Sequence, residues 1–237
     1  MPPFDFEPFS PQTFSGLARL FPLPDLVMFP HALQPLHIFE PRYRAMLASA
    51  QRDDGLIAMT LLEQGEEEAS SKVFPQIAQV VCLGRVVAAT KLSDGRSNIL
   101  LLGIQRARII EELDIARPYR QAAVELLDDE YAIDDLQRQL LHDEIVATLD
   151  ALLPDALRHD EQFRAIFDTD LSLGTLCDIV ANCLPIEVNI KQCLLTETDV
   201  EQRGLLLLET IDELNCEQGA FDLADSQHTF PPRFSDN

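Results

Sequence analysis

Paired carboxylates are the residues of this sequence with the most evident capacity for chemistry. Asp128, Asp129 and Glu130 are consecutive, and Asp160 and Glu161 form a second pair. Two such groups can act as general acid and base when a shaped pocket raises the pKa of one of them. The chain holds 40 Asp and Glu among its 237 residues, so adjacent carboxylates arise from composition alone. We therefore expect solvated carboxylates here and not a catalytic pair.

Thiols and imidazoles are the other groups that could bind a metal or attack a substrate. Cysteines stand at positions 82, 177, 183, 193 and 216, and histidines at 31, 37, 142, 159 and 228. They form no CxxC and no HExxH, the groupings that zinc sites use. Cys82 lies in an apolar run, which is typical of a buried structural thiol and not of a nucleophile. The sequence predicts no metal, no cofactor, and reduced, mostly buried thiols of a cytoplasmic protein.

The nine glycines exclude several nucleotide and hydrolase motifs. The closest two, Gly95 and Gly103, are eight positions apart. The phosphate-binding P-loop, the dinucleotide loop and the G-x-S-x-G elbow all need glycines closer together than this. We expect a protein that is not an enzyme.

Charge is distributed unevenly along the chain, whose net charge is −22. Residues 15–128 hold 12 Lys and Arg against 14 Asp and Glu, whereas residues 129–237 hold 6 against 24. This shift places a boundary after Asp128. Nucleic acid is a poor partner for such a chain, because binding to phosphates needs clustered Lys and Arg. No apolar run is long enough to span a membrane.

The stretch at 20–44 must position much of the chain that comes after it. Prolines at 22, 24, 30 and 35 alternate with apolar residues there, and Pro41 precedes a helical pattern. Proline lacks a backbone N–H and is tolerated at sheet edges and in the first turn of a helix. We expect an edge strand, a loop, and then a helix. The apolar face of that helix holds Tyr43, Met46, Leu47 and Ala50.

Strand patterns continue as far as residue 127. Apolar or alternating runs occupy residues 56–62, 77–92, 98–110 and 119–127. Gly84 inside the second run indicates a bulge, and Asp94-Gly95 indicates a hairpin turn. Together with the opening stretch, these runs predict an α+β fold that begins with a small, mostly antiparallel barrel and one packed helix.

Helical periodicity replaces the strand patterns after residue 130. The first predicted helix carries a stripe that we expect to face the core: Ile133, Leu136, Leu140, Ile145, Leu149, Leu152 and Leu153. Ser172 is the expected N-cap of a later helix. The sequence therefore divides into a flexible tail at 1–14, a barrel at 15–128, a helical bundle at 129–216 and a second tail at 217–237. Phe4, Phe6, Phe9 and Phe14 in the first tail could alternatively dock on this domain or on a neighbouring copy.

Three separated blocks resemble the N-terminal domain of Lon proteases, which also occurs as stand-alone proteins. They read FPLPDLVMFPHALQPLHIFEPRYRAML at 21–47, CLGRVVAATKLSDGRSNILLLGIQRARI at 82–109 and LCDIVANCLPIEVNIKQCLLTETDVEQRGLLLLETI at 176–211. The resemblance implies a six-stranded PUA-like barrel followed by a helical bundle. It also implies recognition of unfolded or extended polypeptide, without the ATPase and protease of the full enzymes, and partners such as a protease or chaperone system.

The loop between Pro24 and Pro35 supplies the candidate contact residues. A peptide can add to an exposed sheet edge through main-chain hydrogen bonds while pockets read alternate side chains. On this basis we expect contacts from Met28, Phe29, His31, Leu33 and Gln34. The alternative for Met28 and Phe29 is that both belong to the core.

RNA binding is the alternative function, because PUA-like barrels elsewhere bind RNA. The sequence offers one local basic cluster for it, at Arg106, Arg108, Arg117 and Arg120. The acidic second half opposes this reading, because it repels phosphates.

Overall fold

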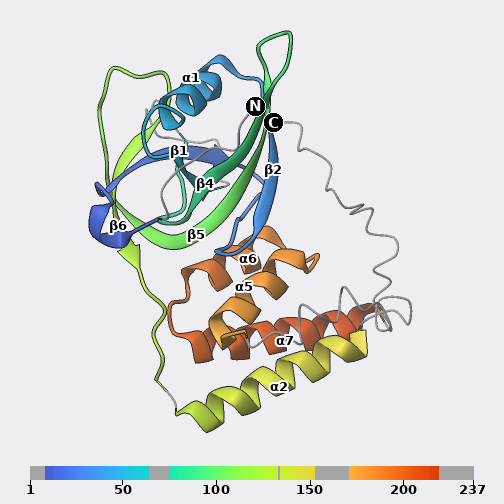
Figure 1. Ribbon diagram of the computed structural model, residues 1–237. Coiled ribbons are helices and arrows are strands. Elements are labelled where there is room, and N and C mark those ends of the chain that lie inside the picture. Colours follow the sequence, from blue (N-terminus) through green and yellow to red (C-terminus); the bar gives the residue numbers. More distant parts are fainter. Residues whose placement is uncertain (1–8, 64–74, 133, 153–170, 219–237) are drawn as a thin grey trace.

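Strands form the first half of the molecule and helices most of the second half (Figure 1). The computed structural model describes residues 9–63, 75–132, 134–152 and 171–218. The strands are β1 (Leu17–Leu23), β2 (Leu33–Ile38), β3 (Leu56–Leu61), β4 (Val80–Lys91), β5 (Ser97–Glu112) and β6 (Gln121–Leu127). The helices are α1 (Pro41–Ala50), α2 (Asp135–Leu152), α5 (Leu173–Cys183), α6 (Val188–Thr196) and α7 (Val200–Gln218), with a short 3-10 turn at Pro11–Thr13.

Five strands form a closed ring of pairings in the order β5, β4, β3, β1 and β6, and β6 returns to β5. A register shift at Leu83/Gly84 confirms the predicted bulge, and further shifts occur in β4 and β5. Bulges bend a strand and increase its twist, which lets the sheet curl onto itself. The turn between β4 and β5 is the predicted one, with Gly95 at φ 85°.

The prediction of a mostly antiparallel barrel is confirmed only in part. Strands β1 and β3 pair in parallel, with Leu20 opposite Ala58. A parallel pair needs a long crossover, and here the chain makes it through β2 and α1. Strand β2 lies outside the ring. It pairs with residues 97–102 of β5, whereas β6 closes the ring by pairing with residues 106–112 of the same strand.

Helix α1 covers the barrel with the face that its periodicity predicts. Tyr43, Met46, Leu47 and Ala50 are its buried residues. The ring centroids of Tyr43 and of Phe21 in β1 lie 4.4 Å apart. The turn after α1 is tied to β1 by Arg19, whose guanidinium donates to Asp53 at 2.5 Å and to Asp54 at 2.7 Å.

Helices α2, α5, α6 and α7 lie together on one side of the barrel (Figure 1). They do not form a bundle with a separate core in the described residues. One cluster of buried apolar side chains runs from the barrel, at Phe29 and Val86, into the helices, at Leu176 and Leu207. The N-cap of α5 is Ser172 as predicted, since its side chain accepts from the N–H of Thr175.

The apolar face predicted for α2 is wrong in its first half. Leu136 and Leu140 are 70% and 60% exposed. The buried residues are Leu141, Ile145 and Leu149, three positions spaced by four. Ile133 and Leu153 lie outside the described residues.

The described part of the first tail contacts the barrel. Phe9 and Phe14 have ring centroids 5.9 Å apart and pack on a smaller core cluster built around Leu20, Val81 and Ile109. Phe4, Phe6 and nearly all of the second predicted tail lie outside the described residues.

Candidate functional site

Strand β2 is an edge strand of the sheet. The proline pattern places the edge at the entering strand instead, but that strand is β1, which pairs with β3 on one side and β6 on the other. Strand β2 pairs with β5 along its whole length, from Leu33 opposite Leu102 to Ile38 opposite Ser97. No strand of the described residues pairs with its other side. Pro35 lies in the middle of β2, where it cannot donate a main-chain hydrogen bond. The carbonyl oxygen of Pro35 accepts a hydrogen bond from the side-chain amide of Gln34, at 3.2 Å.

The loop before β2 is held against β5 by a very close backbone approach. A Cβ on Gly103 would lie 2.0 Å from the carbonyl oxygen of Phe29, so no residue larger than glycine fits there. The N–H of His31 donates to the carbonyl of Gly103, and the N–H of Gly103 donates to the carbonyl of Ala32. His31 adopts φ 65°, which is uncommon for any residue other than glycine.

The structure divides the five predicted contact residues into two groups. Met28 and Phe29 are buried in the core at 1% and 0% exposure, so neither side chain offers a surface to a partner. His31 and Leu33 are exposed and Gln34 is half-buried. The core residues anchor the loop from beneath, and the three others remain candidates for contact.

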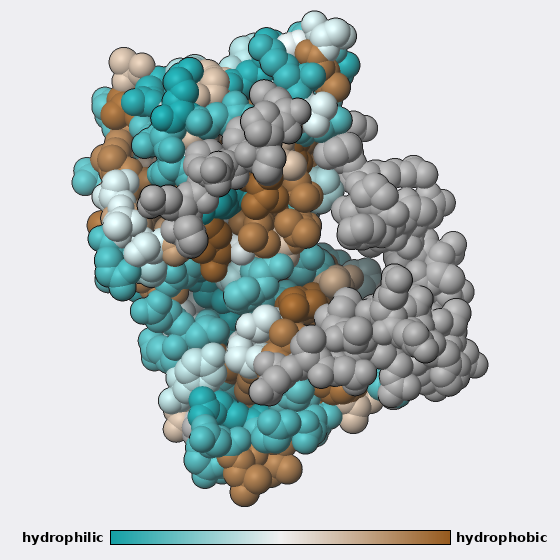
Figure 2. All heavy atoms as spheres, in the orientation of Figure 1, coloured by the Kyte–Doolittle hydropathy of each residue, from teal (hydrophilic) through white to brown (hydrophobic). Residues whose placement is uncertain are grey.

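Alternate residues at β2 form an outward face that the buried Pro35 interrupts, and the prediction included only Leu33 among its residues. Leu33, His37 and Phe39 are separated by even numbers of residues and therefore share one side of the strand, whereas Leu36 and Ile38 are buried on the other. Leu33 is 48% and Phe39 40% exposed. Across the ladder, the half-buried Leu100 and Leu102 extend this face onto β5. Figure 2 shows hydrophobic atoms gathered over β2.

Polar contacts fix the far end of this face. The Nδ1 atom of His37 lies 2.6 Å from the Oδ1 atom of Asn98 on β5. The His37 ring stacks on that of Phe39, with centroids 6.1 Å apart. Phe39 is thereby held at the point where β2 leads into α1.

A cavity opens beyond Phe39, at the end of the barrel next to α1. Phe39, Pro24 and Leu62 line a part of about 300 Å³. This part shares Pro22, Tyr43 and Arg120 with a larger one of about 870 Å³. Arginines at 42, 117 and 120 and acids at 63, 112 and 114 line the larger part. The cavity thus combines apolar walls with charges of both signs.

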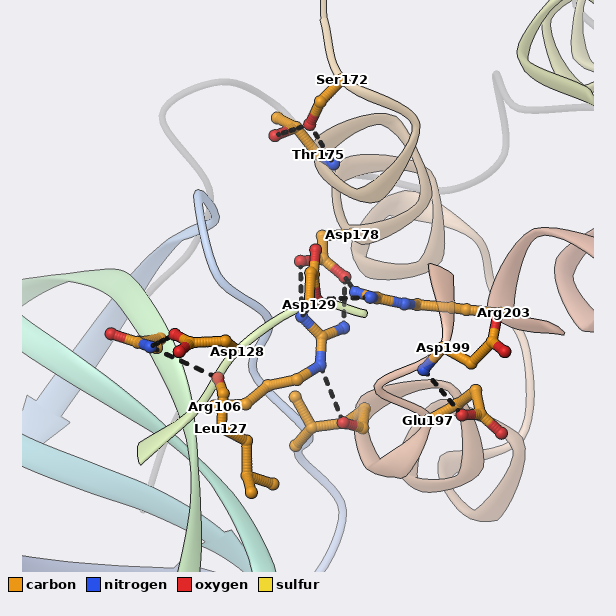
Figure 3. A network of polar contacts seen from close by, with 12 residues as sticks. Arg106, Leu127, Asp128, Asp129, Ser172, Thr175, Asp178, Glu197, Asp199 and Arg203 are labelled. Atoms are coloured by element: carbon orange, nitrogen blue, oxygen red, sulfur yellow. Dashed lines mark hydrogen bonds and ion pairs between the residues drawn. The ribbon is translucent and has the colours of Figure 1, made fainter. Parts of the chain in front are cut away.

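Ion pairs inside the molecule fix the helices against the barrel (Figure 3). Arg106 of β5 donates to both carboxylate oxygens of Asp178 in α5, at 2.9 and 2.5 Å, and to the carbonyl of Leu195 in α6, at 2.9 Å. Arg203 of α7 donates to Asp178 at 2.9 Å and to Asp129 at 2.5 Å. Two guanidiniums and two carboxylates therefore join one strand, the segment after the barrel and three helices.

The two carboxylates of this network favour the charged form of Arg203. Burial opposes the charged form of Arg203, but Asp178 and Asp129 outweigh that effect and raise the pKa of Arg203. The network has a structural role, since both guanidiniums form ion pairs with carboxylates. Sequence reasoning missed it, because Asp178 lies 72 positions from Arg106.

Contacts within the molecule involve three of the four arginines of the basic cluster predicted for RNA binding, and Arg108 is exposed. Arg106 is 2% exposed and belongs to the ion-pair network. Arg120 forms a bidentate pair with Glu112, at 2.7 and 2.6 Å. Arg117 donates to the hydroxyl of Tyr119 at 2.6 Å. The three paired arginines therefore give no evidence for RNA binding.

Two of the four thiols that the structure describes follow the prediction. Cys82 and Cys177 are buried, and burial raises the pKa of both, to about 12 for Cys177. Cys183 and Cys193 are exposed, contrary to expectation, because they lie on outer faces at the end of α5 and in α6. Within the described residues, no group of His, Cys, Asp and Glu could hold a metal ion, and no helix is long and apolar enough to cross a membrane.

Comparison with known proteins places the fold in a family. Residues 18–213 match the family model of the ATP-dependent protease La (LON) substrate-binding domain. The chain belongs to this family.

Relatives and solved structures agree with this assignment. Lon protease 1 of Bdellovibrio bacteriovorus is 29% identical over 200 residues, which cover 84% of this chain and 25% of that protein. Lon protease 2 of Herpetosiphon aurantiacus is 29% identical over 210 residues, covering 84% of this chain and 24% of that protein. The chain thus spans about a quarter of these relatives.

Two solved structures have the same fold. A Lon N-terminal domain protein from Xanthomonas campestris is 21% identical with a TM-score of 0.59, covering 81% of this chain and 97% of that one. The N-terminal domain of the Mycobacterium avium complex Lon protease is 16% identical with a TM-score of 0.64, covering 83% and 98%.

Proposed function

We propose that this chain is a non-catalytic module that binds extended or unfolded polypeptide along β2. The observation that carries the proposal is the edge of β2, which no strand of the described residues covers and which lies beside an exposed apolar face, in a family described as substrate-binding. A bound segment would add to the sheet as a further strand next to β2.

The main chain of β2 is suited to this mode of binding. An added strand gains affinity from backbone hydrogen bonds, which any sequence can make. Pro35 removes one donor from β2, so the edge is weaker than an unbroken one and less prone to pair with another copy. Binding to β2 alone is therefore expected to be weak and reversible.

Side chains on the outward face would supply the remaining affinity. Leu33 and its cross-strand neighbour Leu102 offer apolar contact at one end of β2, and Phe39 offers it at the other. Six residues of strand span about 20 Å, so a peptide along β2 would reach the cavity beyond Phe39. We propose that this cavity receives a side chain of the bound segment.

The buried thiols and the extent of the family match support a recognition module over a catalyst. Cys82 and Cys177 have raised pKa values because they are buried, which makes them poor nucleophiles. The match to the relatives is confined to about a quarter of their length. We propose that the module works in the cytoplasm beside a protease or chaperone system, which would act on what it binds.

Titration with an unfolded model protein tests this proposal. The probe is reduced, carboxymethylated α-lactalbumin, and binding is followed by fluorescence anisotropy and by amide shifts of the ¹⁵N-labelled chain. We expect the largest shifts at Leu33, Gln34 and His37. Leu33→Ser should weaken binding by about tenfold, which corresponds to about 1.4 kcal/mol.

Leu205→Ser is the matched control, because Leu205 of α7 is 51% exposed, close to the 48% of Leu33. It should bind as the parent does. Shifts confined to other surfaces, or equal affinity of the Leu33→Ser variant, would exclude β2 as the site. Absence of any binding would argue against the function itself.

A further inference from the structure

Helix α2 carries apolar residues on two opposite sides. Leu141, Ile145 and Leu149 are buried against the other helices. Positions four apart lie on one face of a helix, and at 100° per residue Leu136 and Leu140 lie nearly opposite that face. Both are more than half exposed, at 70% and 60%. Figure 1 shows α2 as the helix farthest from the barrel, and Figure 2 shows hydrophobic atoms beside hydrophilic ones at that end of the molecule.

Carboxylates flank this exposed leucine pair. Asp143 lies two turns after Leu136, and Glu144 lies one turn after Leu140, so both continue the outward face. The side chain of Asp143 is 63% exposed and that of Asp135, at the start of the helix, 95%. Arg138 is the sole Lys or Arg of α2. Its guanidinium pairs with Asp135 and lies over the ring of Tyr131.

The charge of this face decides which partner it fits. A second copy would bring a second row of carboxylates against the first, and like charges at close range are unfavourable. The residues from 129 onward hold 24 acidic against 6 basic residues, so anionic lipid and nucleic acid would also be repelled. A partner surface that carries both cationic and apolar residues would complement the carboxylates and the exposed leucines of α2.

The spacing of the leucines indicates the shape of that partner. Ridges four residues apart pack into the grooves of a second helix, and charges beside such a seam select the partner by sign. We propose that the outward face of α2 docks an amphipathic helix of another protein, whose apolar stripe is flanked by Lys or Arg. This surface is separate from β2, and it would join the polypeptide-binding module to a partner protein.

Binding to designed helical peptides tests the proposal on the full chain. The probe is a labelled peptide with Leu at i, i+3, i+4 and i+7 and Lys at the flanking positions, and anisotropy gives its Kd. The comparison peptide carries Glu in place of every Lys. We expect the Lys peptide to bind at least tenfold more tightly than the Glu peptide, with an affinity that falls as salt rises.

Two variants separate docking from general attraction to an acidic protein. Leu136→Ser/Leu140→Ser keeps every charge, and because both side chains are exposed the fold should persist. It should weaken binding of the Lys peptide at least tenfold, whereas Leu205→Ser should not. Asp143→Asn/Glu144→Gln should weaken binding and reduce its salt dependence.

Three results would overturn the proposal. The first is equal affinity of the Leu136→Ser/Leu140→Ser variant and the parent, which would mean charge attraction alone. The second is no detectable binding of the Lys peptide by the parent. The third is self-association of the parent in sedimentation that these two substitutions abolish, which would make a second copy the occupant.

Discussion

Arg106 and Asp178 form a buried bidentate ion pair that joins β5 to α5 across 72 positions of sequence. Both side chains are nearly inaccessible, at 3% and 2% exposure. Burying charges is unfavourable unless each finds its counterpart. With Arg203 and Asp129 the network is neutral, so its integrity depends on every member.

Asp178→Asn should therefore destabilise the fold strongly. It leaves the guanidiniums of Arg106 and Arg203 with Asp129 as their one remaining carboxylate in the network. Breaking one side of a buried pair costs about 3–5 kcal/mol, which urea unfolding followed by circular dichroism would detect. Asp94→Asn is the matched control, because Asp94 pairs with Arg96 at the surface, and it should leave the midpoint nearly unchanged. Equal midpoints for Asp178→Asn and the parent would refute a structural role for the network.

Gly103→Ala tests the backbone approach that holds the loop before β2. The added methyl group would meet the Phe29 carbonyl, and backbone cannot move aside as a side chain can. Overpacking of this kind costs about 1–3 kcal/mol, measured as a fall in the free energy of unfolding. Gly204→Ala is the comparison, because its Cβ would meet the flexible end of Leu141 and alanine favours a helix. A larger loss for Gly204→Ala than for Gly103→Ala would show that the loop adjusts freely.

Local patterns predicted the elements near the site well. The four buried residues of α1 follow from a period of 3.6, and the extended segment at β2 agrees with Pro35, which fixes φ and lacks an N–H. The turn at Asp94-Gly95 follows from the positive φ that glycine allows. In each case the physical cause lies within a few residues of its effect.

Pairings between distant residues could not be predicted in the same way. Along α2, Leu136 and Leu140 have the same spacing as Leu141 and Ile145, so periodicity alone does not choose between them. In the structure, Leu141 and Ile145 lie close to Gly204 of α7, a contact that the periodicity of α2 does not reveal. Arg106 likewise alternates with apolar residues, as a surface arginine would. It is buried because it pairs with Asp178, which is far away in sequence.

His31→Gly should keep or slightly increase stability while removing a candidate contact. The left-handed conformation costs an ordinary residue about 1–2 kcal/mol, which glycine avoids, although glycine loses more entropy on folding. His31→Val should destabilise, because a β-branched residue is strained at φ 65°. Urea unfolding gives both values. If His31→Gly keeps the fold but weakens binding of the unfolded probe, the imidazole contacts the peptide, and unchanged affinity would remove His31 from the site.

Stability should fall in alkaline solution because of the buried thiols, and Cys177 provides the test. Its folded pKa is raised to about 12, chiefly by burial, whereas an unfolded thiol titrates near pH 8.5. The unfolded state therefore releases its proton first as pH rises. The stabilising contribution is complete below about pH 8.5 and is lost as pH climbs toward 12, at about 1.4 kcal/mol per pH unit. Cys177→Ala should flatten this slope relative to the parent, and the exposed Cys193→Ser should not. Urea midpoints between pH 8 and 10.5 measure the difference, and parallel slopes for the parent and Cys177→Ala would contradict the buried, protonated thiol.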